Sequence, residues 1–526
     1  MVVTVKFQSV AATETTTMKK IKRQSPARAA LFACATALMA LTPQTHAQST
    51  DDVLINKLEQ KGILTVDEAR EIRAEAAAEQ TNLVNSALMA TKLKMSDSIK
   101  NMQFYGDFRL RYEYRGVNNP TPGSLSMTGV GGSTFAIERF RYALRFGIRG
   151  DLYDAFSYGI RLETSTNPRS PWDTFGKNTT AGSVTPSDKA QSGIGIGQAF
   201  LNWHPTSWYE MTVGRMPMPL YTTPMVWDSD INPEGAFEKF KCTIDHVDLF
   251  ADFGQFVYQD PGPASQFPST DTMLLAWQAG ANVRITKDMS FKAAPVLYTY
   301  SGTGTTSGLN STFVGQGLQG LNAGLPGSAN LLGYNEQGIN DLLVLEIPAE
   351  FNFKIWHTPL GTLQARLFGD FAYNFYGADR AISAYQANPA AFPGLSGPEA
   401  GQNKAYQIGF GIGSDGPVYG PTQGLVYGST SRKNTWEARV YWQHVEQYAL
   451  DVNMIDSDYF EGRGNLQGIY SAFAYSFTDG IIGTVRYGYA NPIKNNLGTG
   501  GNNLDIPGIN PIKNYNIFQA DLTWRF

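Results

Sequence analysis

The sequence predicts an all-β fold, a transmembrane antiparallel β-barrel of about 16 strands preceded by a short N-terminal helical segment. The composition supports this prediction, with 53 glycines, 26 tyrosines, 30 phenylalanines and 9 tryptophans, and only 17% charged residues. No run of about 18 apolar residues follows the N-terminal leader, so no transmembrane helix is expected. From Met102 to Phe526, apolar and polar residues alternate in many segments, as in strands with one apolar and one polar face.

Residues 1–47 carry the features of a leader and secretory signal peptide. From Met18, which fits as the start, MKKIKRQSPAR is a basic n-region and AALFACATALMAL is an apolar h-region. Thr45-His46-Ala47 approximates a cleavage site with small residues at its ends. LFAC at residues 31–34 could also be a lipoprotein cleavage box, but Phe32 is bulky for that role. We therefore expect an exported protein that loses its leader.

Cleavage changes the charge and the cysteine content of the chain. It removes Lys6, Lys19, Lys20, Lys22, Arg23 and Arg28 against Glu14, so the formal net charge of -4 becomes -9. An acidic mature chain does not indicate a nucleic-acid partner. Cys34 is lost with the leader, which leaves Cys242 without a partner for an internal disulfide.

Residues 48–100 form a predicted periplasmic helical segment. Leu54 and Leu58 are four residues apart, and Gly62 stands where a C-terminal helix cap belongs. The sequence TVDE at residues 65–68 is a capping box for a second helix, which is rich in Ala and Glu. The apolar face of this helix is thin. It either packs on a copy of itself, on the barrel rim or on another envelope component, or serves as a solvated spacer.

The barrel is predicted over residues 101–526. In MQFYGDFRLRYEY, which begins at Met102, apolar side chains share one face and polar side chains the other. Segments of roughly 10 residues or more match a tilted crossing of a bilayer. The segments that alternate in this way lie near 102–114, 136–149, 156–164, 194–203, 208–215, 236–243, 245–254, 272–285, 289–300, 342–355, 361–375, 403–413, 434–447, 466–477, 480–490 and 514–526.

The connections between these segments alternate in length. Short turns such as HPTSW and TKDM alternate with long loops rich in Gly, Ser, Asn and Pro. This pattern is typical of short periplasmic turns and long outer loops, with both chain ends in the periplasm. The connection 414–433 is long where a short turn is expected, so either a strand is misplaced there or the turn is elaborated.

A soluble β-sandwich or lectin would also show alternation. It would have shorter strands and would bury its apolar face between two sheets. Here aromatic residues gather at the strand ends, as with Trp203 and Trp208 or Trp436 and Trp442. Such residues suit the two membrane interfaces, so the membrane barrel is favoured.

Arginines gather on the polar face of the first three predicted strands. They are Arg109, Arg111, Arg139, Arg141, Arg145, Arg149 and Arg161. Like charges on neighbouring strands repel, so a purely structural sheet would avoid them unless acids or a solvated pore offset the cost. We expect these arginines to line a pore and to create a field that sorts ions.

The third outer loop contains MPMPLYTTPMVWDSDINPEG, with acids at Asp228, Asp230 and Glu234. If this loop folds inward, its acids would face the arginines across a narrowed channel and orient polar solutes. Alternatively, Asp228, Asp230 and Asn232 only cap and shape a turn that contains proline. A calcium loop is disfavoured, because Pro233 stands where an EF-hand needs glycine.

Several stretches resemble known families. The C-terminal QADLTWRF, ending at Phe526, is similar to the assembly signal of Gram-negative outer-membrane barrels, which implies recognition by the barrel assembly machinery. FYGDFRLRYEY, RFRYALRFGIRG, VGRMPMP and WDSDINPEG occur in an order that resembles the bacterial putative porin family. KGILTVDEAREI resembles the N-terminal segment of those porins and of phosphate-selective porins.

The resemblance implies a channel in the outer membrane of a bacterial cell, surrounded by lipid and lipopolysaccharide. General porins are trimers in which the third loop constricts the pore. By position, the resemblance implies this role for residues 216–235, and it also implies a homotrimer.

Other functions find little support in the sequence. A barrel enzyme would need a nucleophile or water activated by a base, but the histidines of the mature chain, His204, His246, His357 and His444, lack a Ser or Asp partner at a telling spacing. No HExxH or GxSxG motif occurs. An active TonB-type transporter would need about 22 strands and a plug domain. We therefore expect no enzymatic activity, no catalytic residue, no metal and no cofactor.

The sequence thus favours a passive, water-filled diffusion channel for small hydrophilic solutes and ions. Arg366, Arg439, Arg486 and Arg525 also fall on polar faces, which favours anions slightly although the chain is acidic. The alternative left open is a closed structural or adhesive outer-membrane barrel that acts through its loops.

Overall fold

The structure, a computed structural model, covers most of the predicted barrel. It describes residues 98–118, 134–153, 155–165, 167, 170–176, 193–259, 272–301, 342–359, 361–387, 396–414, 433–499 and 512–526. All of them belong to one compact unit, Ser96–Phe526. The predicted leader (1–47) and nearly all of the predicted helical segment (48–100) lie outside the described residues and stay predictions.

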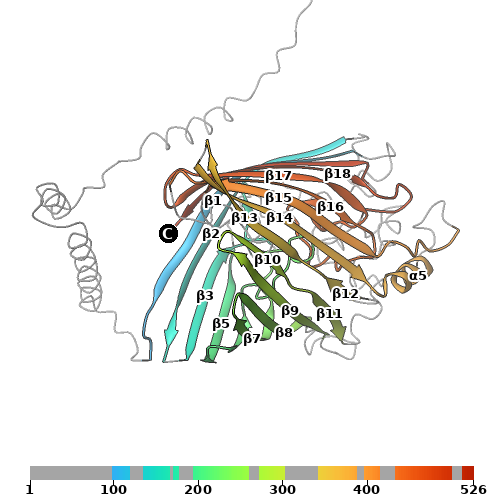
Figure 1. Ribbon diagram of the computed structural model, residues 1–526. Coiled ribbons are helices and arrows are strands. Elements are labelled where there is room, and N and C mark those ends of the chain that lie inside the picture. Colours follow the sequence, from blue (N-terminus) through green and yellow to red (C-terminus); the bar gives the residue numbers. More distant parts are fainter. Residues whose placement is uncertain are drawn as a thin grey trace, which may run out of the picture. The chain divides into compact units, whose positions relative to one another are not determined.

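The described residues form one antiparallel sheet of nineteen strands (Figure 1). In chain order these are β1 (Gln103–Asn118), β2 (Thr134–Leu152), β3 (Phe156–Thr164), β4 (Asp173–Thr174), β5 (Ile194–Thr206), β6 (Tyr209–Arg215), β7 (Glu234–Ile244), β8 (Val247–Gln259), β9 (Thr272–Thr286), β10 (Met289–Ala293), β11 (Val296–Ser301), β12 (Leu343–Glu346), β13 (Ala349–Thr358), β14 (Gly361–Asn374), β15 (Lys404–Ser414), β16 (Trp436–Val445), β17 (Leu466–Ser476), β18 (Ile481–Pro492) and β19 (Asn514–Arg525). Helix α5 (Gly377–Ala387) follows β14, and the short 3-10 helix η5 (Phe460–Gly462) precedes β17.

β1 closes the sheet into a barrel, because it pairs with β2 along one edge and with β19 along the other. β10 and β11 form a single stave against β9, and β12 and β13 form a single stave against β14. The two-residue strand β4 pairs with β2 beyond the reach of β3. The described residues therefore form a closed barrel of 16 staves, which confirms the predicted fold and excludes the β-sandwich.

The predicted strand positions are confirmed, since each segment that alternates overlaps a stave of the barrel. β15 and β16 flank the connection 414–433 and pair directly with each other, with Ala405 opposite Val445. No strand is therefore misplaced on either side of that connection. Residues 415–432 themselves lie outside the described part of the chain.

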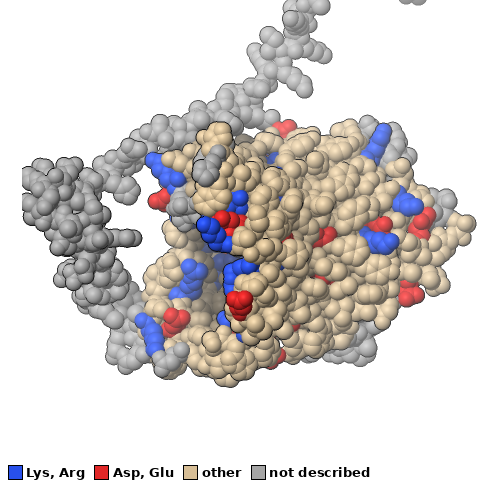
Figure 2. All heavy atoms as spheres, in the orientation of Figure 1, with Lys and Arg blue, Asp and Glu red and all other residues tan. Residues whose placement is uncertain are grey.

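The barrel is apolar on the outside, and its wall arginines face the inside. On β2, Leu144 and Phe146 are 41% and 40% exposed, whereas Arg145 between them is only 9% exposed. Figure 2 shows a nearly uncharged area right of the centre of the view, between charged side chains on the left and at the right-hand rim. Adjacent side chains of a strand face opposite sides, so alternation in the sequence becomes a lipid-facing surface and a polar lumen.

The C-terminal residue completes the closure of the barrel. The backbone N–H of Phe526 donates to the carbonyl of Gly106 at 3.2 Å, and the N–H of Gly106 donates to the carbonyl of Phe526 at 3.0 Å. The Phe526 ring lies outside the barrel, with its centroid 6.5 Å from that of Phe146 on β2. The last residue thus fastens β19 to β1 on the apolar surface.

Candidate functional site

The loop between β6 and β7, residues 216–233, folds into the barrel lumen. Two glycines, Gly214 before the loop and Gly235 after it, lie opposite each other at its base. Their φ angles are 118° and 147°. A Cβ atom on Gly214 would lie 2.3 Å from the carbonyl oxygen of Ala199, and one on Gly235 would lie 2.1 Å from that of Gln255. Only glycine fits such positions without strain, so this pair lets both strands leave the wall here.

A second loop, residues 446–465 between β16 and β17, also folds inward and joins the first loop. The N–H of Asp228 donates to the carbonyl of Met454 at 2.5 Å, and the N–H of Asp456 donates to that of Pro224 at 3.0 Å. The N–H and the hydroxyl of Ser457 both donate to the Asp228 carboxylate at 3.3 Å. The two loops therefore form one structure inside the lumen.

Apolar packing fills the side of the lumen away from the arginines. Met225 and Trp227 of the first loop and Ile455 of the second belong to the same buried cluster as Phe256 and Tyr298 of the wall. This packing leaves the remaining opening beside the strands that carry the arginines.

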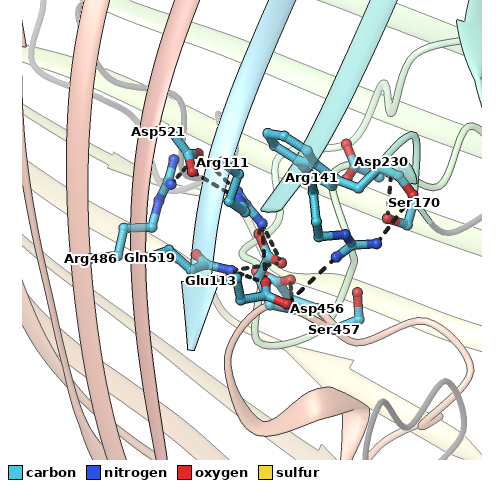
Figure 3. Close-up of polar contacts among 12 residues, drawn as sticks. Arg111, Glu113, Arg141, Ser170, Asp230, Asp456, Ser457, Arg486, Gln519 and Asp521 are labelled. Atoms are coloured by element: carbon cyan, nitrogen blue, oxygen red, sulfur yellow. Dashed lines mark hydrogen bonds and ion pairs between the residues drawn. The ribbon is translucent and has the colours of Figure 1, made fainter. Parts of the chain in front are cut away.

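We call the inner face of the strands that carry these arginines the arginine wall. On this wall, Arg111 is held by two acids. Its Nε and Nη2 donate to the two oxygens of Asp521 on β19 at 2.8 and 3.0 Å, and its Nη1 donates to Asp458 of the second loop at 2.9 Å. The Trp172 ring covers its guanidinium at 4.0 Å. Figure 3 shows Arg111 and Arg486 directed at the same Asp521 carboxylate. Paired and fork-shaped contacts of this kind fix the orientation of a guanidinium.

Arg115 extends the wall along β1 and binds the second loop. Its Nη1 donates to the carbonyl of Ser457 at 2.9 Å, and its Nη2 donates to Glu113 at 3.0 Å. Glu113 is fully buried and also accepts from Nε of Arg139 at 2.7 Å, while Arg141 approaches it to 3.8 Å. Strand carboxylates therefore neutralise much of the arginine wall, as a dense row of like charges requires.

The other predicted arginines differ in their surroundings. Arg145 binds Asp230 of the first loop and lies 3.4 Å from Glu163. Arg161 binds Glu163 at 3.1 Å, and Arg109 binds Asp107 of its own strand. Arg149 is exposed and donates to Gln103 at 3.0 Å, away from both loops.

A cavity of about 250 Å³ lies between this wall and the two loops. Its walls carry both signs of charge beside apolar groups. They consist of Arg109, Arg111, Arg145, Arg486, Asp228, Asp230, Asp456, Asp458, Trp172, Trp227, Pro217, Met218, Pro224, Thr222, Thr223 and Ser229. The cavity thus brings together three of the predicted arginines with two of the predicted loop acids.

The third predicted acid, Glu234, lies elsewhere. It is exposed at the start of β7, where it binds Arg215, and it does not line the cavity. Asp228 also shapes its own turn, because its carboxylate accepts the N–H of Asp230 at 2.9 Å. Asp228 therefore both faces the cavity and caps a turn.

Two acids of the second loop have pKa values that are shifted in opposite directions. Burial raises the pKa of Asp456 to about 7, and repulsion by Asp458 adds to this shift. Burial alone would also raise the pKa of Asp458, but Arg111 and Arg115 lower it below its ordinary value. Near neutral pH, Asp456 is partly protonated while Asp458 is charged.

Sequence reasoning missed Arg115, Trp172, Asp456 and Asp458. Arg115 could have been found by following the alternation of β1 one residue further, since it shares a face with Arg109 and Arg111. Asp456 and Asp458 belong to an outer loop with several acids, DVNMIDSDYFEG, which is a weak signal of an inward fold. No periodic pattern marks Trp172.

Within the described residues, no group of three or more His, Cys, Asp or Glu side chains is arranged to hold a metal ion. Among the helices of that part of the chain, none has the length and apolarity needed to cross a membrane.

A closed barrel with an apolar exterior and a charged internal constriction is typical of a porin-like channel. A family model described as putative porin matches residues 69–317, which confirms the resemblance to the bacterial putative porin family. This match indicates the bacterial outer membrane as the location of the protein. No curated protein matches the sequence at a significant level.

The barrel is similar to solved structures of bacterial outer-membrane proteins. The outer membrane channel DcaP of Acinetobacter baumannii is 12% identical with a TM-score of 0.37, and the alignment covers 82% of this chain and 99% of that chain. OprB of Pseudomonas putida is 10% identical with a TM-score of 0.43, over 81% of this chain and 94% of that chain. OpdQ of Pseudomonas aeruginosa is 11% identical with a TM-score of 0.34, over 82% and 99%.

Proposed function

We propose that the protein is a passive, water-filled diffusion channel for small hydrophilic solutes and ions. The observation that carries this proposal is the cavity of about 250 Å³ between the arginine wall and the two inward loops. Fixed charges of both signs around a narrow passage act on an ion by their local potential. The chain needs no cofactor or catalytic residue for this role.

The proposed channel prefers anions slightly. Arg109, Arg145 and Arg486 reach the cavity from the wall, and partial protonation of Asp456 removes part of the opposing negative charge. The Asp458 carboxylate is engaged by Arg111 and Arg115, which limits its attraction for free cations. The potential at the cavity therefore governs selectivity in this proposal, whereas the acidic net charge of the chain does not.

The proposed assembly is a homotrimer in the outer membrane, in contact with lipid and lipopolysaccharide. The apolar outer surface supports the lipid contact, since side chains such as Phe104 and Trp277 are 51% and 50% exposed. The C-terminal strand ending at Phe526 is proposed to be the segment that the barrel assembly machinery recognises.

One observation favours a second candidate, a closed barrel that acts through its outer loops. The two inward loops pack on each other and on the wall through a buried apolar cluster, which occupies part of the lumen. A barrel with no continuous water path would have this property. Conductance separates the two candidates.

The test is the zero-current potential of the purified protein in a planar bilayer under a KCl gradient. The proposal predicts steady single-channel steps and a potential whose sign is that of an anion-preferring pore. A cation-preferring sign would refute the anion preference and leave the channel. A complete lack of steps, with folded protein shown to be in the membrane, would refute the channel and favour the closed barrel.

A further inference from the structure

The middle of the first inward loop is attached to the wall opposite the arginines. The side-chain amide of Gln278 on β9 accepts from the N–H of Tyr221 at 2.9 Å and donates to the carbonyl of the same residue at 2.8 Å. The ammonium of Lys292 on β10 lies 3.7 Å from the centre of the Tyr221 ring. Tyr221 is therefore held through both its backbone and its ring.

The next two residues of the loop are bound by carboxylates of the same wall. Glu346, the last residue of β12, accepts from the Thr222 hydroxyl at 2.7 Å, from the Thr223 N–H at 3.2 Å and from the Tyr298 hydroxyl at 2.6 Å. The Thr223 hydroxyl donates to Asp370 on β14. Glu346 is fully buried, so its bonds to the loop are made away from bulk water.

The wall is irregular at the level where the loop docks. Pro295 separates β10 from β11, and Pro348 separates β12 from β13 on the neighbouring stave. The Ala294 N–H donates to the carbonyl of Pro348 at 3.1 Å, and Gln278 donates to that of Ala294 at 3.1 Å. Prolines inside a barrel wall remove ladder hydrogen bonds, and such breaks redirect nearby side chains. Here Glu346 is two residues before Pro348, and Gln278 donates to Ala294, the residue before Pro295.

We propose that Glu346 is the positioning residue of the constriction. It does not line the cavity, but Thr222 and Thr223, which it binds, do. By holding these residues on one wall, it sets how far Asp228 and Asp230 extend toward the arginines on the other. Pore width and ion preference therefore depend on a carboxylate that no permeating solute touches. This inference rests on the proposed function as a diffusion channel.

The experiment compares the full-length wild-type channel with Glu346→Ala, Glu346→Gln and the control Asp252→Ala. Asp252 is a buried acid on the inner face of β8, so the control removes a buried carboxyl group from a different stave. Each protein is tested for single-channel conductance, zero-current potential, the size of polyethylene glycol that enters the pore, and the temperature at which the barrel unfolds. The first three report the constriction, and the last reports the barrel itself.

Glu346→Ala is expected to raise the conductance about twofold and to admit larger polymers, because the loop loses two hydrogen bonds at its centre. Glu346→Gln keeps an oxygen that can accept from both threonines, so it is expected to retain the wild-type conductance and polymer limit. The control is expected to leave these quantities unchanged.

Several results would overturn the inference. These are wild-type pore properties in Glu346→Ala, the same change in Asp252→Ala, or loss of the wild-type values in Glu346→Gln. If Glu346→Ala does not fold, Thr222→Val replaces it, since it removes the hydroxyl that donates to Glu346 while the strands stay intact. Wild-type pore properties in Thr222→Val would then refute the role of Glu346. A wild-type protein that gives no channel refutes the proposed function instead, which keeps the two failures distinct.

Discussion

Asp230 of the inward loop and Arg145 of β2 form an ion pair across the lumen of the barrel. The pair joins the two parts of the constriction, the arginine wall and the acidic loop. The guanidinium of Arg145 also lies 3.4 Å from Glu163 on β3, so it is shared between a loop acid and a wall acid.

Replacing this guanidinium is expected to shift ion preference toward cations. Arg145→Gln removes one positive charge from the cavity and leaves Asp230 and Glu163 less compensated. The anion-to-cation permeability ratio should fall about threefold, which corresponds to ~0.6 kcal/mol in a hydrated pore. The zero-current potential in a KCl gradient measures this ratio. Arg149→Gln is the matched control, because Arg149 is on the same strand but exposed outside the cavity.

The ion preference is expected to depend on pH through Asp456. Its pKa is raised to about 7, so the neutral form prevails at lower pH and the carboxylate at higher pH. Lowering the pH through this range makes the cavity more positive, and the anion preference should rise. Zero-current potentials measured at roughly one pH unit below and above that pKa should therefore differ. Asp456→Asn should keep the low-pH value throughout, and an unchanged titration in this variant would contradict the assignment.

The glycine at the base of the inward loop is expected to be sensitive to substitution. In Gly214→Ala, the new Cβ would lie 2.3 Å from a backbone oxygen at a φ of 118°. The cost should be about 1–3 kcal/mol, seen as a lower unfolding temperature of the barrel in gel-mobility assays. Gly401→Ala is the control, since a Cβ there meets nothing within 4 Å. Equal unfolding temperatures for the two variants would show that the bend does not require glycine.

Arg115 is expected to hold the second loop in the lumen. Arg115→Met removes the donor to the Ser457 carbonyl and one of the cations that surround the buried Glu113. We expect a loss of about 3 kcal/mol in stability together with noisier single-channel currents. Arg115→Lys keeps the charge but not the forked geometry and should be intermediate. Quiet currents in Arg115→Met would show that the contacts between the two loops hold the second loop by themselves.

Removal of Phe526 tests the proposed role of the C-terminus in assembly. The barrel keeps all of β19, so the shortened chain should still fold in detergent without the contacts of Phe526 to Gly106 and Phe146. In cells, the amount of protein in the outer membrane should fall severalfold if the assembly machinery recognises this residue. Equal amounts of the shortened and the full chain in the membrane would refute that recognition.

The barrel itself could be predicted from the sequence because the strand period is local. Successive residues face opposite sides, so alternation such as Phe108, Arg109, Leu110 and Arg111 marks strand, lipid face and lumen face together. The wall arginines and the acids of the first loop could be found in the same way, by their place on a face or in a long outer loop. Their roles in ion selection stay predictions.

Only the tertiary structure shows which residues form the constriction. Arg111 meets Asp521 across 410 positions of the chain, and Asp228 meets Ser457 across 229. Loops carry no period, so nothing local shows that residues 446–465 turn inward or that Glu346 binds the first loop. Such contacts depend on the closed barrel, which brings β1 beside β19 and both loops into one confined lumen. The sequence alone therefore determined the wall and its two faces. Closure of the barrel determined which side chains meet inside it, because those contacts join segments that are distant in the chain.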